Sequence, residues 1–246
     1  MPTAIVTGAA RGIGRSICDA LAAAGYGVIG LDRSFLPDFP YRAVTADICE
    51  LQNEDPSLDS LCGELSRLVG GKLDLLVNNA AHQVVTTIAE ATPEHWHDTL
   101  GTNLLAPFWL TKGLLADLQE SRGCVVNISS VHARLTKPGF SLYATSKAAL
   151  VSLTRSMALE LAPHVRVNAI LPAATDTPML AAGFAANPEL ADSLAAHHPL
   201  QRIARSDEIA QAVVFLGTPA SSFVTGTALN VDGGIAGLLH DPGALQ

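Results

Sequence analysis

The sequence has few aromatic residues and no cluster of basic residues. Aromatic residues make up 5% of the 246 positions and hydrophobic residues 48%, so the core must be packed mainly from Ala, Leu, Val and Ile. The net charge is −8, and the 15 Lys and Arg residues form no run. Because nucleic-acid phosphates are bound by clustered cations, we expect no nucleic-acid partner.

Cysteine is also scarce, and long apolar runs are missing. The four cysteines are Cys18, Cys49, Cys62 and Cys124. They form no CxxC pair, so we expect reduced core thiols. No uninterrupted apolar run reaches the roughly 20 residues that cross a membrane. The opening MPTAIVTG lacks the basic start of a secretory signal. We therefore expect a cytoplasmic protein that does not enter a membrane.

Short apolar segments alternate with helical patterns along the chain. The predicted strands cover 3–8, 26–32, 42–47, 72–80, 123–129, 165–171 and 227–233. The predicted helices include 13–24, 57–69, 94–118, 143–162 and 206–216. This alternation is typical of an α/β fold in which helices cover both faces of a mainly parallel, seven-stranded sheet. With no linker or repeat to divide the chain, we expect one doubly wound, Rossmann-like domain over 1–246.

One segment, 173–205, interrupts the alternation. It carries Pro178, Pro188 and Pro199 among alanines and follows the sixth predicted strand. Ligands bind beyond the carboxyl ends of the strands in such sheets, and long insertions there are usually functional. We interpret the segment as a substrate lid. The alternative is a purely structural helical excursion.

The stretch TGAARGIG places Gly8, Gly12 and Gly14 between the first predicted strand and helix. Glycine permits a tight turn and lets a pyrophosphate approach the backbone, and the helix N-terminus that follows favours an anion. The following GIGRS lacks the Gly-Lys-Ser/Thr of a P-loop. The pattern therefore indicates a dinucleotide site.

Asp32 ends the second predicted strand and bears on which dinucleotide is bound. A carboxylate there accepts hydrogen bonds from both ribose hydroxyls of NAD and repels the additional phosphate of NADP. Arg11 and Arg33 lie close by in sequence, and either guanidinium can meet a phosphate. We favour NAD over NADP. The alternative for Asp32 is a helix or turn cap.

Tyr143 and Lys147 stand four positions apart in a predicted helix and share one helix face. A free phenol has a pKa of about 10, and a neighbouring ammonium lowers that value. The pair is therefore either a proton donor tuned by its neighbour or a chance surface pair. We expect the pKa of Tyr143 to be lowered.

Across its whole length, the chain resembles the short-chain dehydrogenase/reductase family. The motifs, in family order, are Thr7-Gly-x-x-x-Gly-x-Gly14, Asp47, NNAA at 78–81, Asn103, Ser130, Tyr143-x-x-x-Lys147, Pro172 with Thr177, and VDGG at 231–234. Two positions depart from the family pattern, because Ala81 and Ala173 replace its usual glycines. Both replacements are small and affect local backbone freedom rather than chemistry.

The resemblance implies hydride transfer between a nicotinamide cofactor and a secondary alcohol or ketone. Tyr143 would act as general acid and base, and Ser130 would hold the substrate oxygen. Lys147 would lower the pKa of Tyr143 and bind the nicotinamide ribose. Asn103 would bind, through its carbonyl, a water that links Lys147 to solvent. Pro107 supports this, because a proline four positions on leaves that carbonyl without its helical partner; the alternative is an ordinary kink.

For the cofactor, the resemblance implies a set of residues that follow the predicted strands. They are Gly8, Arg11, Gly12, Ile13, Gly14, Asp32, Arg33, Asp47, Ile48, Asn79, Ala80, Ala81, Tyr143, Lys147, Pro172, Ala173, Thr175 and Thr177. Asp47 resembles the family's adenine contact, and Thr177 resembles the residue that fixes the carboxamide. Asn79 resembles a residue with a mainly structural role beneath the cofactor.

The substrate remains open at this stage. The candidate pocket residues are Gln83, Ser130, His132, Leu135, Phe140, Ala173 and Met179. Their mixture of polar and apolar types suits a small polyol, sugar or hydroxy acid. The alternatives are an NADPH-dependent 3-oxoacyl-[acyl-carrier-protein] reductase and a non-catalytic NAD-binding sensor or scaffold. One observation argues against the acyl reductase. In the stretch LQESRG the acidic Glu120 opposes Arg122, at a place where these reductases use basic residues to bind an acidic carrier.

The remaining histidines point to no metal site. His95 and His97 flank Trp96 on a predicted helix, and no further ligands are evident nearby in sequence, so we expect a solvated helix face. By position, His82 and His132 should lie at the mouth of the pocket, and His197-His198 should form a hinge of the lid. The resemblance also implies a homotetramer or dimer.

Overall fold

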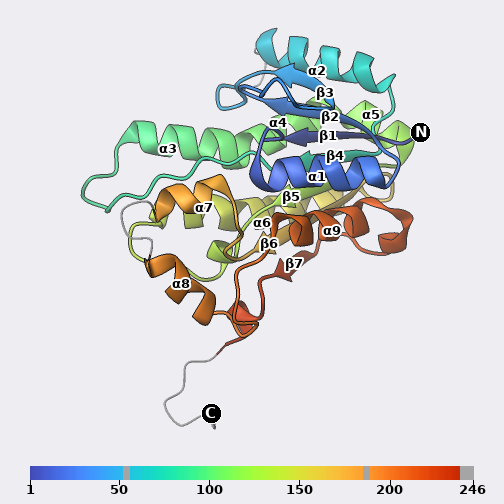
Figure 1. The fold of residues 1–246 in the computed structure, drawn as a ribbon. Helices are drawn as coiled ribbons and strands as arrows, with labels where there is room; N and C mark the ends of the chain where they lie inside the picture. Colours follow the sequence, from blue (N-terminus) through green and yellow to red (C-terminus); the bar gives the residue numbers. More distant parts are fainter. Residues whose placement is uncertain (52–55, 185–188, 239–246) are drawn as a thin grey trace.

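One seven-stranded sheet forms the centre of the protein (Figure 1), for which a computed structural model describes residues 1–51, 56–184 and 189–238. The strands are β1 (Thr3–Thr7), β2 (Gly27–Asp32), β3 (Arg42–Thr45), β4 (Leu75–Asn78), β5 (Cys124–Ile128), β6 (Arg166–Pro172) and β7 (Ala228–Val231). Their order is β3-β2-β1-β4-β5-β6-β7, and all neighbours are parallel. This confirms the predicted α/β class, although most predicted strands were too long at their ends.

The central strands are apolar throughout because both faces of the sheet are covered. Every residue of β4 (LLVN) and β5 (CVVNI) is buried. A strand covered on one face would alternate apolar and polar residues, whereas a strand covered on both reads as a continuous apolar run. In β3, which forms one edge of the sheet, Val44 is buried and the other three residues are exposed.

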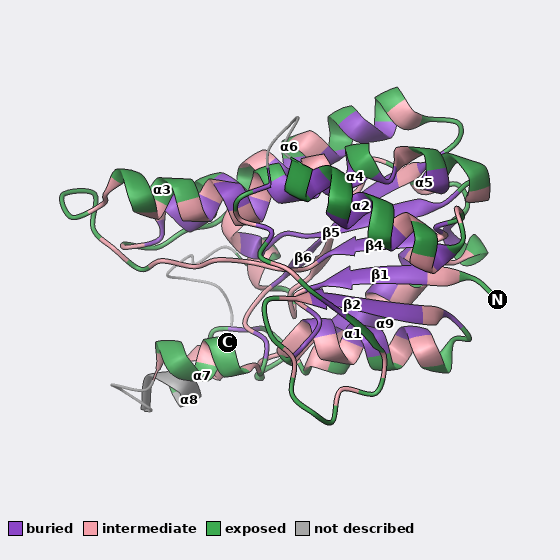
Figure 2. Cartoon of the chain, turned by 90° about the horizontal axis from the view of Figure 1, so that it is seen from above, coloured by how far each residue is buried: buried purple, intermediate pink, exposed green. Residues whose placement is uncertain are grey.

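Helices pack on the two faces of the sheet as separate layers (Figure 2). The helices of the described part of the chain are α1 (Gly12–Ala23), α2 (Pro56–Val69), α3 (Pro93–Leu100), α4 (Ala106–Gly113), α5 (Leu115–Ser121), α6 (Ser141–Leu161), α7 (Pro178–Gly183), α8 (Glu189–Ala196) and α9 (Ser206–Gly217). Of these, α3, α7 and α8 lie beyond the edge of the sheet rather than on its faces (Figure 1). On one face of the sheet α1 and α9 bury Ile17 and Val213, and on the other α2, α4 and α6 bury Leu65, Leu110 and Met157.

The single helix predicted over 94–118 is wrong, because the chain forms three α-helices joined by irregular turns. A π-helical turn, η1 (Gly101–Leu105), separates α3 from α4, and Ala106 N–H donates to the carbonyl of Gly101 five residues back. Pro107 has no N–H to continue the α-helical ladder at this point. The disturbance expected at this proline is therefore present as a π turn. A water bound by the Asn103 carbonyl stays a prediction.

The parallel strands bring the loops that follow β1, β4, β5 and β6 to one edge of the sheet. The strand order reverses between β1 and β4, which is where such sheets bind ligands. The segment predicted as a lid holds α7 and α8, and a bridge between Thr175 and Ala204 ties its two ends together. Figure 1 shows both helices beyond this edge of the sheet. Pro188 lies outside the described residues.

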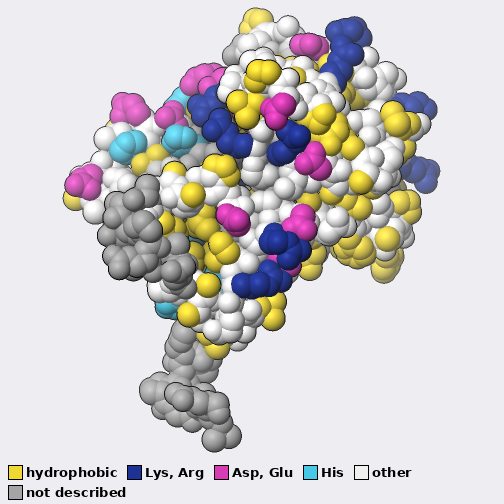
Figure 3. All heavy atoms as spheres, in the orientation of Figure 1, with side chains coloured by type: hydrophobic (Ala, Val, Ile, Leu, Met, Phe, Trp, Pro, Cys, Tyr) yellow, Lys and Arg dark blue, Asp and Glu magenta, His cyan; other side chains and the backbone are white. Residues whose placement is uncertain are grey.

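Charged side chains are spread over the surface. On the face drawn in Figure 3, Lys and Arg side chains form separate small groups, several of them beside Asp or Glu. Two such pairs join Arg202 to Glu208 at 2.7 Å and Arg205 to Asp207 at 2.9 Å. None of the helices in the described part of the chain has the length and apolar character needed to cross a membrane.

Candidate active site

A cavity of about 1200 Å³ lies at the carboxyl edge of the sheet. Every residue predicted to hold the cofactor lines it, from the glycine-rich turn to the segment after β6. Its walls also include residues that no motif marked. They are Leu31, Ala46, Thr102, Thr136, Lys137, Ala174, Ala182, Phe184, Ser193, Leu194, Ile235 and Leu238, among others. These residues come from separate parts of the chain, so only the folded structure identifies them.

Two glycines of the glycine-rich turn, Gly8 and Gly14, have no room for a side chain. A Cβ on Gly14 would lie 2.0 Å from the carbonyl oxygen of Gly8, and Gly8 itself has a φ of +64°. Arg11, the N-cap of α1, makes no capping bond with its side chain, and the first turn of α1 carries no acidic residue. The helix therefore presents its positive end to the cavity, which suits a pyrophosphate.

Thr7 and Asn79 hold the glycine-rich turn against the end of β4. The amide of Asn79 donates to the carbonyls of Thr7 and Gly8 at 2.9 and 3.1 Å. The Thr7 hydroxyl accepts from the backbone N–H groups of Asn79 and Ala80, both at 3.0 Å. These bonds fit the mainly structural role predicted for Asn79.

Asp32 lies where the cavity passes the end of β2. Its carboxylate accepts from the backbone N–H groups of Ala10 at 3.0 Å and Arg33 at 2.7 Å, so its orientation is fixed. The Arg33 side chain is 74% exposed and lies 3.9 Å from Asp47. The Asp32 carboxylate therefore caps the turn, as the alternative interpretation expected. The same residue also lines the cavity.

Ser130, Tyr143 and Lys147 meet at another part of the same cavity. Tyr143 and Lys147 lie on one face of α6, with the Lys147 Nζ 5.6 Å from the centre of the Tyr143 ring. Lys147 is only 1% exposed, and its Nζ donates to the carbonyl of Ile128 at 2.9 Å. A hydrogen bond joins the side chains of Ser130 and Tyr143. A chance surface pair is thereby excluded.

The expected lowering of the pKa of Tyr143 is wrong for this structure. Burial raises the pKa of Tyr143 to about 12, and the hydrogen bond with Ser130 opposes that shift. Burial also lowers the pKa of Lys147 to about 7. Both groups lose hydration, and desolvation disfavours the charged form of each. The spacing of the pair in sequence does not reveal this.

We expect Ser130→Ala to shift the pH dependence of alcohol oxidation to higher pH. The Ser130 bond lowers the pKa of Tyr143, so its removal raises that pKa and leaves less phenolate at a given pH. Measured from about pH 7 to 10, kcat should rise with pH in both proteins. The variant should need a higher pH to reach the same fraction of its maximal kcat. Ser156→Ala, at an exposed serine of α6 outside the cavity wall, is the control. Coinciding profiles for Ser130→Ala and the unaltered protein would contradict the expectation.

Asn103 lies behind the cavity wall rather than in it. It is fully buried, and its side-chain oxygen accepts from the N–H of His82 at 2.7 Å. Its amide donates to the carbonyl of His82 at 2.9 Å and to the hydroxyl of Ser146 at 3.0 Å. The side chain thus fastens the segment after β4 to α6, beside Lys147. This structural role was not foreseen.

Most predicted substrate residues line the cavity, but Phe140 does not. Gln83, His132, Leu135, Ala173 and Met179 are in the wall. Phe140 is 7% exposed and packs against the ring of His132, with the ring centres 4.7 Å apart. Contact between Phe140 and substrate stays a prediction, and in this structure the ring packs against His132 instead.

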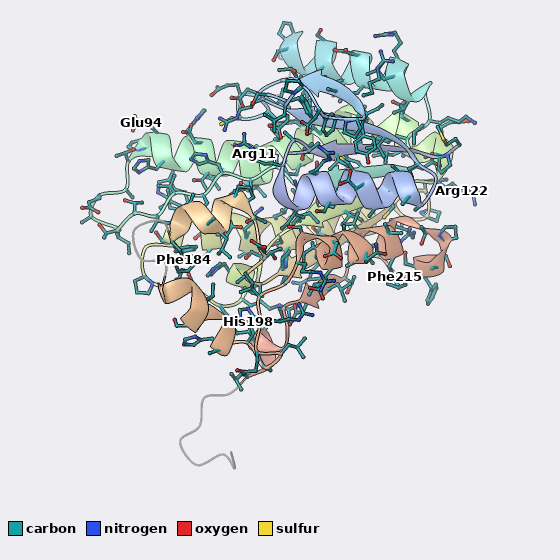
Figure 4. The ribbon with its side chains drawn as sticks, viewed as in Figure 1. Arg11, Glu94, Arg122, Phe184, His198 and Phe215 are labelled. Carbon is teal, nitrogen blue, oxygen red and sulfur yellow. The ribbon has the colours of Figure 1, made fainter. Side chains whose placement is uncertain are left out.

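The segment after β6 closes over the cavity. Thr177 caps α7 by accepting from Leu180 N–H at 3.2 Å, and its methyl carbon lies 3.4 Å from where a Cβ on Gly12 would stand. Figure 4 shows that Arg11, Phe184 and His198, all of which line the cavity, come from the α1 turn, the end of α7 and the region after α8. His82 and His197 also reach the wall.

These features fit a nicotinamide dinucleotide and a small substrate. The glycine-rich turn leaves open backbone for a pyrophosphate, Asp32 offers a ribose acceptor, and the proton-transfer candidates lie further along one continuous cavity. The arrangement defines a dinucleotide-dependent oxidoreductase.

Comparison with known proteins agrees with this class. Residues 8–236 match the family described as enoyl-(acyl carrier protein) reductase. L-xylulose reductase of Bos taurus is 36% identical over 94% of this chain and 95% of its own. A 3-oxoacyl-[acyl-carrier-protein] reductase of Vibrio cholerae is 34% identical over 94% and 96%. The structure of Thermoplasma acidophilum aldohexose dehydrogenase matches with a TM-score of 0.93 at 31% identity, over 99% of this chain and 97% of that one. The chain belongs to the short-chain dehydrogenase/reductase family of NAD(P)-dependent oxidoreductases.

Proposed function

We propose that the protein is an NAD-dependent dehydrogenase that interconverts a secondary alcohol and a ketone on a small polyol, sugar or hydroxy acid. One observation carries the proposal: a single cavity joins the carboxylate of Asp32 to the hydroxyls of Ser130 and Tyr143. The named relatives, an L-xylulose reductase and an aldohexose dehydrogenase, support a hydroxylated substrate.

The proposed mechanism assigns one task to each side chain. When bound, the nicotinamide supplies a hydride acceptor and a positive charge. Ser130 donates a hydrogen bond to the substrate oxygen and holds it beside Tyr143. The Tyr143 phenolate takes the alcohol proton as the carbinol hydrogen leaves as hydride, and in reduction the phenol returns a proton to the carbonyl oxygen. In its protonated form Lys147, whose Nζ lies 5.6 Å from the centre of the Tyr143 ring, stabilises the phenolate.

In this proposal, 1–246 work as one domain and 173–205 form the lid over the substrate. Met179 and His132 would contact the substrate from the lid and from the loop after β5. Asn103 would assist proton transfer through its backbone carbonyl and position α6 through its side chain. We further propose a cytoplasmic homotetramer or dimer that acts on a free small molecule, without nucleic-acid or membrane partners.

The cofactor preference is tested by titrating the purified protein with NADH and NADPH and following fluorescence. We expect NADH to bind at least about tenfold more tightly, because Asp32 repels the additional phosphate. Asp32→Ala should level or reverse the preference. Asp38→Ala, on an exposed loop residue, is the matched control and should leave the preference unchanged. Tighter NADPH binding by the unaltered protein would mean that Arg11 and Arg33 outweigh Asp32.

A second candidate is an NADPH-dependent 3-oxoacyl-[acyl-carrier-protein] reductase. The Vibrio cholerae relative and the apolar lining from Leu135, Phe184 and Leu238 favour it. The sequence argument against it needs revision, because Glu120 pairs with Lys72 at 3.1 Å rather than opposing Arg122. Turnover of acyl thioesters with NADPH, but of no sugar, polyol or hydroxy acid with NAD, would select this candidate. Tight NAD binding without any turnover would favour a sensor or scaffold.

A further inference from the structure

A group of metal-binding side chains lies outside the cavity, between the segment after β3 and α3. The thiol of Cys49, the carboxylate of Glu50 and the ring of His97 each place a donor atom within 4.8 Å of the others. His97 is almost fifty positions from Cys49 and Glu50 in the sequence, so the pattern around His97 predicted only a solvated helix face. Figure 3 shows histidine and acidic side chains gathered over the α3 region.

Individual contacts show how closely the donors approach. His97 Nε2 lies 3.9 Å from a Glu50 carboxylate oxygen. Asp98 flanks the group at the other ring nitrogen, with its Oδ1 at 3.4 Å from His97 Nδ1 and 3.9 Å from Cys49 Sγ. One carboxylate, an imidazole and a thiol therefore lie within reach of one ion, and a dication would neutralise the negative charge that Glu50 and a Cys49 thiolate carry.

The backbone around Cys49 is fixed by the fold. Its N–H donates to Asp47 at 3.0 Å, and its thiol donates to the backbone carbonyl of Asp98 at 3.7 Å. Gly101 lets the π turn approach closely, because a Cβ there would lie 2.6 Å from the Cys49 carbonyl oxygen. The half-buried thiol is therefore held in place beside α3, while the more exposed Glu50 and His97 can adjust their rotamers.

We propose that Cys49, Glu50 and His97 form a zinc-binding site, with a water molecule as the fourth ligand. Zinc prefers thiolate, imidazole and carboxylate ligands in tetrahedral geometry, at about 2.0 to 2.3 Å. Such bond lengths place ligand atoms roughly 3.3 to 3.8 Å apart, so the present spacing needs a contraction of about 1 Å or slightly more. Coordination displaces the thiol proton to solvent, and no electron transfer is involved.

The site adjoins the cavity without being part of it. Asp47 and Ile48, which immediately precede Cys49, line the cavity, and so does Thr102. Zinc would connect this cavity-lining segment to α3. The binding proposal itself does not depend on which cofactor or substrate the cavity takes, so the two proposals fail separately.

The test is a zinc titration of the full-length, reduced protein in competition with a chromogenic chelator. We expect one zinc per chain, and Cys49→Ser and His97→Gln should each weaken binding at least about tenfold, the range seen when even outer partners of a site are lost. His164→Gln replaces another exposed histidine and serves as the matched control. Zinc binding that survives both Cys49→Ser and His97→Gln unchanged, or no binding by the unaltered protein, would overturn the proposal.

Two further readouts keep the proposal testable if a variant folds poorly. Cobalt should produce a near-ultraviolet sulfur-to-cobalt band in the unaltered protein and none in Cys49→Ser. Cys49 is the only cysteine of the four that is not buried, so it should react first with a thiol reagent, and zinc should protect it. A cobalt complex without the sulfur band, or a thiol that zinc does not protect, would exclude Cys49 as a ligand.

Discussion

Replacing Tyr143 by phenylalanine is expected to reduce kcat/KM by about a thousandfold, within the 10²- to 10⁴-fold range of a lost general acid and base. The ring remains packed near Phe140 and His132, with ring centres 6.1 and 6.0 Å away, so the fold and NADH affinity should change little. Only the hydroxyl that bonds with Ser130 is removed. The measurement is steady-state oxidation and reduction with the substrate found by screening, together with an NADH titration.

Tyr26→Phe is the matched control for this experiment. It removes a phenolic hydroxyl that donates to the carbonyl of Gly217 at 3.0 Å, outside the cavity wall. Its kcat/KM should stay within about threefold of the unaltered protein. A Tyr143→Phe protein that retains a tenth or more of the original activity would remove Tyr143 from its proposed role.

Replacing Lys147 by methionine is expected to lower activity by a comparable 10²- to 10⁴-fold and to change how stability depends on pH. The pKa of Lys147 is about 7 in the fold, against a usual value near 10.4 when unfolded. The unfolded chain therefore binds more protons between these values, and the unaltered protein gains stability as pH rises through this window. The lysine's contribution is fully present only above the unfolded pKa, and it is lost as pH falls toward 7.

Methionine carries no titrating proton, so the variant should lack this part of the pH dependence. From about pH 7 to 10, the stability of the unaltered protein relative to Lys147→Met should rise by an amount of the order of a few kcal/mol. Urea unfolding of both proteins at several pH values measures this. Lys72→Met, a surface lysine paired with Glu120, should keep the pH dependence of the unaltered protein. Parallel curves for Lys147→Met and the unaltered protein would show that Lys147 remains charged in the fold.

Much of the fold and cofactor site could be predicted because local chemistry decides them. Continuous apolar runs such as LLVN require cover on both faces. The glycines of TGAARGIG are required by backbone geometry, as the 2.0 Å approach at Gly14 demonstrates. In a parallel sheet, the loops that follow the carboxyl ends of the strands all lie at one edge. Residues that directly follow a predicted strand could therefore be assigned to one cavity.

Helix boundaries and burial were less predictable from the sequence. The apolar pattern over 94–118 is continuous, yet Pro107 and the close approach at Gly101 replace one helix by α3, a π turn and α4. Phe140 and His132 are near in sequence, but only packing determines that His132 lines the cavity and Phe140 supports it from behind. Such choices depend on neighbours that are distant along the chain.

By itself the sequence determined the α/β class, the glycine-rich turn, and the placement of Tyr143 and Lys147 on one helix face, because backbone geometry and residue spacing are local properties. Only the tertiary structure decided that burial raises the pKa of Tyr143 and lowers that of Lys147, because hydration depends on everything packed around a group. Only the tertiary structure brought Cys49 near His97, because the segment that follows β3 lies beside α3, which is distant along the chain.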